Sequence, residues 1–183
     1  MKKPTSDITS RKRTIITVLG ITVLLLLMLM SITGRVSFAG IPNLDSNNIS
    51  NLNKYKEALK AYDKAIEINP QNSAAWDNKG NVLDQLNKYE EALKAYDKAI
   101  EVNPLNSAAW YNKAVTLDNL NKSIDAIKAY EKVIGINPQD SKAWYNKGLA
   151  LEHLGKSDEA RIAYDKAIET DPHNSMAWNN KSN

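Results

Sequence analysis

Two patterns of apolar and polar residues divide the chain. Residues 14–34 contain no charged side chain, and the run from 15 to 32 is almost wholly apolar. About 20 such residues at 1.5 Å each cross a hydrocarbon core of about 30 Å, so residues 15–33 are predicted to form a transmembrane helix. From residue 53 onward apolar residues recur three or four positions apart, the spacing of amphipathic helices. This second pattern predicts an all-helical domain over residues 53–183.

The charges around the apolar segment predict its orientation. Five basic residues precede it in a tail of residues 1–14, and only Arg35 follows it closely. Basic residues next to a membrane span are enriched on the cytoplasmic side. We therefore expect a single-pass membrane protein with a cytoplasmic N-terminus and with the helical domain outside.

A cleaved signal peptide is the alternative to this anchor. Ser37 and Ala39 are small residues at the spacing of a cleavage site, and cleavage near Ala39 would release a secreted protein. Against cleavage, the apolar run is longer than the usual length of about 7–15 residues. Arg35 also lies between the run and the site. We favour the anchor and keep the signal peptide as the alternative.

The helical domain is built from repeats of 34 residues. Four residue types recur with this step: Trp76, Trp110, Trp144 and Trp178; Pro70, Pro104, Pro138 and Pro172; Tyr62, Tyr96, Tyr130 and Tyr164; Ser73, Ser107, Ser141 and Ser175. Internal repeats of this length indicate a stack of identical supersecondary units, each of which buries its apolar face against its neighbours. We therefore expect one continuous core that runs through the stack.

Each repeat is predicted to contain two helices. Trp76 and Leu83 lie on one stripe of a first helix, and Ala92 and Tyr96 lie on the stripe of a second. A polar break separates the two stripes. Pro104 ends the second helix, because proline lacks an amide hydrogen and disfavours the helical conformation of the residue before it.

These positions resemble the tetratricopeptide repeat, whose pattern is a tryptophan, a small residue, a leucine, an alanine, an aromatic residue, a second small residue and a proline at fixed offsets. The matching residues are Trp76, Gly80, Leu83, Ala92, Tyr96, Ala99 and Pro104, then Trp110, Ala114, Leu117, Ala126, Tyr130, Val133 and Pro138, then Trp144, Gly148, Leu151, Ala160, Tyr164, Ala167 and Pro172. The resemblance implies an all-α fold, a right-handed superhelical solenoid of antiparallel helix pairs.

The resemblance divides the rest of the chain into repeats and a linker. Full repeats are expected at residues 73–106, 107–140 and 141–174, with half-units at 53–72 and 175–183. Residues 34–52 contain a proline and several asparagines and are predicted to be a linker. The half-units leave uncovered faces at both ends, so a homo-oligomer that associates through incomplete end repeats is a second structural possibility.

Charge and composition exclude several classes of function. Six Lys or Arg face one Asp up to residue 35, whereas eighteen face twenty Asp or Glu after it, so the net charge of +3 belongs to the N-terminal part. The repeats carry no basic excess for phosphates, which argues against nucleic acid as a partner. The chain has no cysteine, and His153 and His173 stand without further ligands at metal spacing. We expect no enzyme activity, cofactor or metal.

Asparagine follows each repeated tryptophan by two positions, about 200° around the helix and therefore away from the core of the repeat. These residues are Asn78, Asn112, Asn146 and Asn180. A side-chain amide both donates and accepts hydrogen bonds, which suits the backbone of an extended peptide. In tetratricopeptide repeats, which the chain resembles, this position lines the concave groove. The four asparagines are therefore candidate ligand-binding residues, with Tyr111 and Tyr145 beside them as anchors for a partner's side chains.

Charged residues on the groove side refine this prediction. Family members that bind chaperones hold a carboxylate with several Lys or Arg, but here Lys142 is the only candidate, and Asp84, Asp118 and Glu152 oppose an anionic ligand. We therefore expect a scaffold that binds a protein or peptide without that clamp. Lysines follow each tryptophan by three positions, at Lys79, Lys113, Lys147 and Lys181. Their stems are predicted to pack on a neighbouring helix while the amines reach water.

Overall fold

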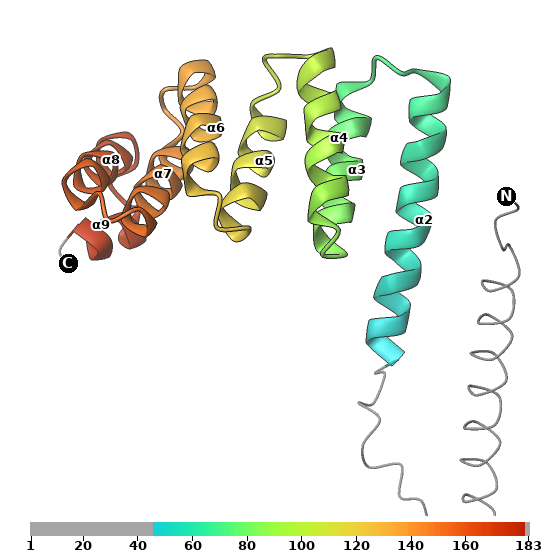
Figure 1. Ribbon diagram of the computed structural model, residues 1–183, viewed down its shortest axis with the longest axis horizontal. Helices are drawn as coiled ribbons and strands as arrows, with labels where there is room; N and C mark the ends of the chain where they lie inside the picture. Colours follow the sequence, from blue (N-terminus) through green and yellow to red (C-terminus); the bar gives the residue numbers. More distant parts are fainter. Residues whose placement is uncertain (1–45, 182–183) are drawn as a thin grey trace, which may run out of the picture. The chain divides into compact units, whose positions relative to one another are not determined.

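The computed structural model describes residues 46–181, which form eight α-helices (Figure 1). These are α2 (Ser46–Ile68), α3 (Ser73–Gln85), α4 (Tyr89–Val102), α5 (Ser107–Asn119), α6 (Ser123–Ile136), α7 (Ser141–His153), α8 (Ser157–Thr170) and α9 (Ser175–Lys181). The helical solenoid predicted from the repeats is confirmed for these residues. The predicted tail of residues 1–14 and the apolar segment of residues 15–33 lie outside the described part of the chain.

The helices alternate between two types. We call α3, α5, α7 and α9 the first helices, because they carry the repeated tryptophans, and α2, α4, α6 and α8 the second helices. The first helices α3, α5 and α7 begin with a side-chain cap: Asn72, Asn106 and Asp140 accept a hydrogen bond from the backbone N–H three residues on. Such a cap satisfies one of the amides that a helix start leaves unpaired.

Tight turns join the two helices of each repeat. Asn87 and Asn121 adopt φ of 57°, and Gly155 adopts φ of 71° at the equivalent place. Asparagine and glycine tolerate this left-handed conformation better than other residues. The polar break predicted in the sequence is therefore a turn that reverses the chain after one residue of unusual backbone geometry.

The prolines hold the start of the next first helix. The indole Nε1 of Trp76, Trp110 and Trp144 donates to the carbonyl oxygen of the proline six residues earlier, at 3.0 Å in each case. The same bond joins Trp178 to Pro172 at 3.1 Å. Each tryptophan thus fixes the loop that precedes its own helix as well as contributing apolar surface.

Small residues and tyrosines fill the core of each repeat. Tyr96, Tyr130 and Tyr164 are at most 2 % exposed. A Cβ atom at Gly80 or at Gly148 would collide with the ring of the tyrosine sixteen residues later, so glycine allows the two helices to approach closely there. The middle repeat has Ala114 at this position, also fully buried.

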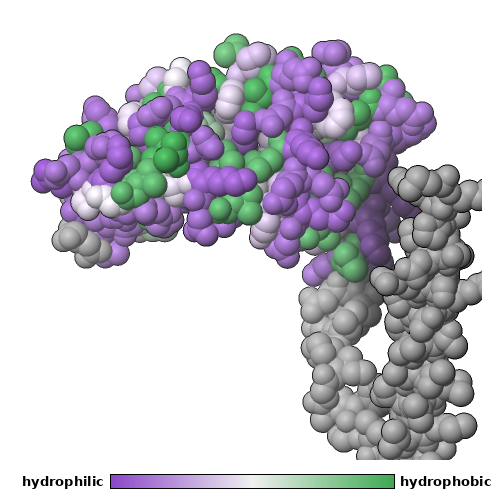
Figure 2. Space-filling model, viewed as in Figure 1, coloured by the Kyte–Doolittle hydropathy of each residue, from purple (hydrophilic) through white to green (hydrophobic). Residues whose placement is uncertain are grey.

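Neighbouring repeats stack mainly through a second helix and the first helix that follows it, α4 with α5 and α6 with α7, and the first helices also meet one another. α3 contacts α5 and α5 contacts α7, whereas α4, α6 and α8 pack mainly on the helices next to them in the chain. In Figure 1 the described helices follow one another along an arc. We call the side where the first helices meet the inner face, and the opposite side, formed by the second helices, the outer face. Figure 2 shows a mostly hydrophilic surface with separate hydrophobic patches.

The helical region begins earlier than predicted. α2 begins at Ser46, where the sequence predicts a linker up to residue 52. Leu52, Tyr55 and Leu59 continue the apolar stripe of this helix toward its start, at i, i+3 and i+7. The stripe therefore overrides the weak helix propensity of the asparagines in this segment.

None of the helices in residues 46–181 combines the length and the apolar composition that a membrane crossing requires. The predicted membrane segment, residues 15–33, lies outside these residues.

Candidate functional site

A line of hydrogen bonds runs along the inner face, from each first helix to the next. The amide nitrogen of Asn112 donates to Asp77 Oδ1 at 3.0 Å, and that of Asn146 donates to the Tyr111 hydroxyl at 2.6 Å. Asn180 donates to the Tyr145 hydroxyl at 3.4 Å. Each bond joins residues 35 positions apart, and together they form what we call the inner seam.

In the inner seam, three of the predicted asparagines donate a hydrogen bond through their side-chain amide nitrogen. Asn112, Asn146 and Asn180 are half-buried, and their nitrogens are bound within the chain, so their carbonyl oxygens are the groups left for a ligand. Asn78 is exposed on the first of these helices. The structure therefore brings three of the four predicted asparagines into contact with the neighbouring repeat, a role that the sequence did not predict.

Tyr111 and Tyr145 lie on the same seam and pack on the core tyrosines. The ring of Tyr111 meets that of Tyr130 edge-on with centroids 5.9 Å apart, and Tyr145 lies 5.8 Å from Tyr164. Burial raises the pKa of Tyr111, and the nearby Asp140 raises it further. Because an asparagine donates to each hydroxyl oxygen, the O–H proton of each tyrosine is left to donate to a ligand.

Asp77 takes the tyrosine's place in the first full repeat. Asp77 is only 7 % exposed, so this carboxylate is buried on the inner face. Burial raises the pKa of Asp77, and the hydrogen bond from Asn112 opposes this rise. A buried carboxylate bound by one neutral donor favours proton uptake.

The acidic residues at the far end of the first helices also join neighbouring repeats. The Thr116 hydroxyl donates to Asp84 Oδ1 at 2.6 Å. Asp118 Oδ1 accepts from the Ser123 hydroxyl at 2.9 Å and lies 3.3 Å from His153 Nδ1. Asp84 and Asp118 thus belong to the inner face with the seam, as the repeat offset predicts.

A pocket of about 290 Å³ opens on the inner face between α5 and α7. Its lining contains two predicted site residues, Tyr111 and Asn112, and the lysine that the sequence singled out, Lys142. The other lining residues are Ser107, Ala108 and Asp140. Ala108 and Lys142 are exposed. The pocket therefore offers a hydroxyl donor, a carbonyl acceptor and one amine to a group that enters it.

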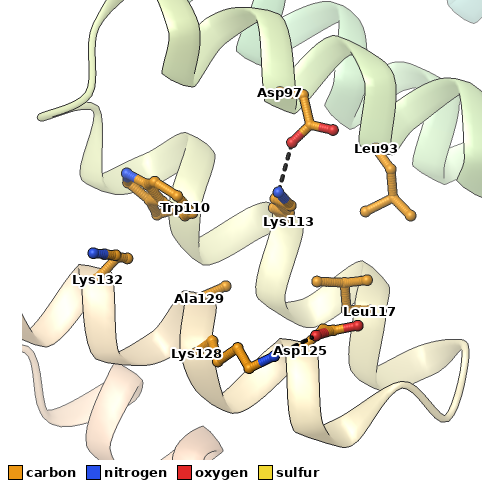
Figure 3. Close-up of a pocket in the computed structure, with 9 residues that line it drawn as sticks. All are labelled: Leu93, Asp97, Trp110, Lys113, Leu117, Asp125, Lys128, Ala129 and Lys132. Carbon is orange, nitrogen blue, oxygen red and sulfur yellow. Dashed lines mark hydrogen bonds and ion pairs between the residues drawn. The ribbon is translucent and has the colours of Figure 1, made fainter.

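The outer face carries a different, strictly repeated contact. Figure 3 shows it in a pocket of about 400 Å³ between α4, α5 and α6. The amine of Lys113 lies 5.4 Å from the centre of the Trp110 ring and pairs with Asp97 at 2.5 Å. A cation in this position is attracted both by the quadrupole of the aromatic ring and by the negative charge of the carboxylate.

The same contact recurs in every repeat, and we call it the outer bracket. Its members are Trp76, Lys79 and Asp63; Trp110, Lys113 and Asp97; Trp144, Lys147 and Glu131; Trp178, Lys181 and Asp165. The sequence predicts that the lysine amines reach water, but in the structure they pair with an acidic residue of the preceding second helix. In the sequence, the acidic residue directly after each repeated tyrosine could have predicted this ion pair.

A second outer pocket lies one repeat further along. It has a volume of about 540 Å³ between α6, α7 and α8. Ile124 and Leu154 on its rim are exposed, Ile124 by 60 %. The charges around it are paired within the chain, for example Lys147 with Glu131 and Lys156 with Glu159, both at 2.8 Å. This pocket is apolar and electrically balanced.

Profiles of known families match the repeats directly. One tetratricopeptide-repeat profile matches residues 78–141 and 117–175, and another matches residues 61–94, so the matches cover more than half of the chain. The chain belongs to the tetratricopeptide-repeat family. Proteins of this family mediate protein–protein interactions. No curated protein sequence matches the chain.

Solved tetratricopeptide-repeat structures resemble the described helices. A crystal structure of MamA is 21 % identical, covers 77 % of this chain and 81 % of its own, and has a TM-score of 0.67, a likeness of fold. The first such domain of Spaghetti (RPAP3), bound to the HSP90 peptide SRMEEVD, is 28 % identical over 61 % of this chain and 89 % of its own, with a TM-score of 0.59. The corresponding domain of OM64 from Arabidopsis is 25 % identical over 60 % and 91 %, with a TM-score of 0.57.

The described residues offer no cluster of metal-ligating side chains. Among residues 46–181 no three His, Cys, Asp or Glu side chains lie close enough together to hold a metal ion. His153 instead lies beside Asp118 on the inner face.

Proposed function

We propose that this tetratricopeptide-repeat protein is a scaffold that binds a segment of another protein along its inner face. The observation that carries the proposal is the inner seam with the pocket beside it, where hydrogen-bonding groups are held in place but left partly unsatisfied. Groups fixed before binding lose little conformational freedom when a ligand arrives. The predicted site residues Asn78, Asn112, Asn146, Asn180, Tyr111 and Tyr145 line this face.

The hydrogen-bonding pattern favours an extended backbone as ligand. Tyr111 supplies an O–H donor and Asn112 a carbonyl acceptor, and Tyr145 and Asn146 supply the same pair one repeat later. A peptide backbone presents acceptors and donors in alternation and so matches such pairs. The half-buried tyrosine rings would add apolar contact with side chains of the bound segment.

The charge of the inner face does not suit an acidic ligand such as the peptide SRMEEVD, to which the structural neighbour RPAP3 is bound. Lys142 is the one lysine in the lining of the inner pocket, and Asp140 lies in the same lining. Asp84 and Asp118 add negative charge further along the first helices. An acidic tail would therefore meet repulsion here.

A membrane anchor is the second part of the proposal. Residues 15–33 would hold the protein in the membrane, with residues 1–14 in the cytoplasm and the repeats outside. Cleavage near Ala39 would secrete the repeats instead. Protease treatment of intact cells should remove the repeats, and mass measurement of the mature chain should find residues 1–39 still attached. Protected repeats would contradict the orientation, and loss of residues 1–39 would contradict the anchor.

Self-association is the second candidate function. In α2 the repeated Tyr62 is only half-buried, whereas the equivalent Tyr96 is 1 % exposed, so this helix leaves apolar surface open. A second copy covering this surface would make the apparent mass rise with concentration. Sedimentation of the full chain in detergent over a wide concentration range should decide this, since a constant monomer would exclude the candidate.

The binding proposal is tested with two matched substitutions. Ala108→Arg fills the inner pocket without removing a seam bond, and Ile124→Arg places the same charge on the outer face. Both residues are exposed, so both variants should fold. Proteins that co-purify with the full chain should be lost with Ala108→Arg and retained with Ile124→Arg, as measured by quantitative mass spectrometry. Retention in both variants, or loss only with Ile124→Arg, would contradict an inner binding face.

A further inference from the structure

We propose that the inner face selects a positively charged segment, rich in Lys or Arg, from among the possible protein ligands. This inference rests on the proposed function and names the chemistry of its ligand. It follows from a difference in how the two faces balance their charges.

The four carboxylates of the outer bracket are each paired with lysine. Asp63, Asp97, Glu131 and Asp165 each bind the lysine of an outer bracket at 2.5–2.8 Å. On the first helices, Asp84 and Glu152 form no ion pair with Lys or Arg of residues 46–181, and Asp118 has only His153 beside it. The carboxylates of the outer bracket therefore each have a lysine partner, whereas Asp84, Asp118 and Glu152 on the inner face have no Lys or Arg partner among the described residues.

The inner carboxylates are also held in position. Asp84 accepts from the Thr116 hydroxyl at 2.6 Å, and Asp118 accepts from the Ser123 hydroxyl at 2.9 Å. The side chain of Asp118 is 16 % exposed, so part of its hydration is already lost. Neutral donors orient a carboxylate but leave its charge in place, and a charge in a partly dehydrated site attracts an opposite charge more strongly than one in bulk water.

The third repeat supplies an independent observation. The hydroxyl of Tyr164 is buried and has no hydrogen-bond partner within residues 46–181. In the first repeat the equivalent Tyr96 donates to Asn81 Oδ1 at 3.0 Å, but Leu149 stands at the asparagine's place here. Burial raises the pKa of Tyr164, the neighbouring Glu152 raises it further, and the neighbouring Asn180 opposes the rise. A buried hydroxyl without a partner is rare and destabilises the folded state.

Glu152 can accept a hydrogen bond from the unpartnered Tyr164 hydroxyl when a cation binds. Its side chain is exposed, so it can turn toward the Tyr164 hydroxyl, which would donate to one carboxylate oxygen. The other oxygen would then face the inner surface beside the unbalanced charges of Asp118 and Asp84. An ammonium or guanidinium group carries several N–H donors and a positive charge, and so can bind the carboxylate oxygens of Asp84, Asp118 and Glu152.

The test compares two fluorescein-labelled probes of equal length, a peptide of six Lys-Thr pairs and a peptide of six Glu-Thr pairs. Anisotropy is measured with the full chain in neutral detergent. We expect the Lys-Thr peptide to bind about tenfold more tightly or better, with affinity falling as salt rises. The triple variant Asp84→Asn, Asp118→Asn and Glu152→Gln should lose about tenfold in affinity for it. Asn and Gln keep an acceptor for Thr116, Ser123 and Tyr164.

The control variant makes the same change in net charge on exposed glutamates of the second helices: Glu90→Gln, Glu101→Gln and Glu169→Gln. It should bind the Lys-Thr peptide within about twofold of the wild type, since distant surface charges are screened. Equal losses in the two triple variants would overturn the inference, and so would preference for the Glu-Thr peptide.

Ala108→Arg separates this inference from the proposed function. If the Glu-Thr peptide binds better and Ala108→Arg removes that binding, the inner face is still the binding surface and only the charge preference is wrong. If neither peptide's binding responds to Ala108→Arg, both proposals are wrong. Loss of Lys-Thr binding in Ala108→Arg and in the inner triple variant alone supports both.

Discussion

The inner and outer faces of the same helical stack are built on opposite plans. On the outer face the bracket of tryptophan, lysine and acid repeats four times with almost no change, and its charges are paired. On the inner face the seam begins with Asp77 and continues with Tyr111 and Tyr145 at the same position. Carboxylates there have no Lys or Arg partner among the described residues. The contact that repeats without change joins each second helix to the next first helix, whereas the residue at the seam position varies between repeats.

The two faces also differ in what their pockets offer. The outer pockets combine apolar floors with paired charges, as Figure 3 shows for Lys113 with Asp97 and for Lys128 with Asp125. The inner pocket presents Tyr111, Asn112 and Lys142, whose polar groups can bind a ligand. The outer pockets are larger than the inner pocket. We nevertheless propose the inner pocket as the binding site, because its polar side chains can form hydrogen bonds with a ligand.

The largest expected effect is on stability, and it distinguishes a buried residue of α6 from an exposed residue of the same helix. Tyr130 and Ile124 both lie on α6, but Tyr130 is 2 % exposed and packs on Tyr111, whereas Ile124 is 60 % exposed. Tyr130→Ala should lower the free energy of unfolding by about 3–5 kcal/mol, because it leaves a cavity. Ile124→Ala should change it by less than about 0.5 kcal/mol. Urea denaturation followed by circular dichroism measures both, and similar losses would contradict the burial described here.

The next effect tests the close approach of helices within a repeat. Gly148→Ala places a methyl group against the Tyr164 ring, whereas Gly135→Ala meets nothing within 4 Å. Gly148→Ala should destabilise by about 1–3 kcal/mol, because the packed ring must shift. Gly135→Ala should stabilise by about 0.5–1 kcal/mol through helix propensity. Opposite signs in melting temperature are expected, and a stabilising Gly148→Ala would show that this glycine is not required by packing.

Asp77 offers a test of the inner seam with a smaller effect. Burial raises the pKa of Asp77, so its ionised form is destabilising at neutral pH and the folded state gains stability as pH falls through the raised pKa. Asp77→Asn keeps an acceptor for Asn112 and should stabilise by an amount on the order of 1 kcal/mol at pH 7. This gain should shrink as pH is lowered toward 3.8, the ordinary value. A gain independent of pH in thermal melts would contradict the proposed cause.

The smallest effect concerns the outer bracket. Lys113→Met keeps the apolar stem over Trp110 but removes the pair with Asp97, whose side chain is 57 % exposed. The loss should be at most about 1 kcal/mol and should vanish at high salt. Peptide binding to the inner face should not change. Altered peptide affinity in Lys113→Met would mean that the two faces are not independent.

The fold could be predicted from the sequence because its determinants repeat. Trp110, Pro104 and Tyr130 belong to sets that recur every 34 residues, and each contacts parts of the chain that are close in sequence. The period and the helix pattern therefore locate them without a structure. The start of α2 was harder, since Leu52 lies among asparagines that favour turns.

The site could be predicted only in part. The offset of Asn112 from Trp110 placed it away from the core of the repeat, and the structure agrees. What the offset could not show is that Asn112 and Asp77, 35 residues apart, meet across two repeats and bind each other. Nor could it show that Leu149 deprives the Tyr164 hydroxyl of the partner that Asn81 gives Tyr96. Contacts between repeats depend on the angle at which they stack, which no single repeat encodes.

Site-specific photocrosslinking tests most directly whether the inner face is the binding surface. p-Benzoylphenylalanine replaces Lys142 on the inner pocket or Lys128 on the outer pocket, two exposed lysines of the same chain. After irradiation of cells, we expect a discrete crosslinked protein from position 142 and none from position 128. Crosslinking from position 128 alone would contradict the account and move the binding surface to the outer face.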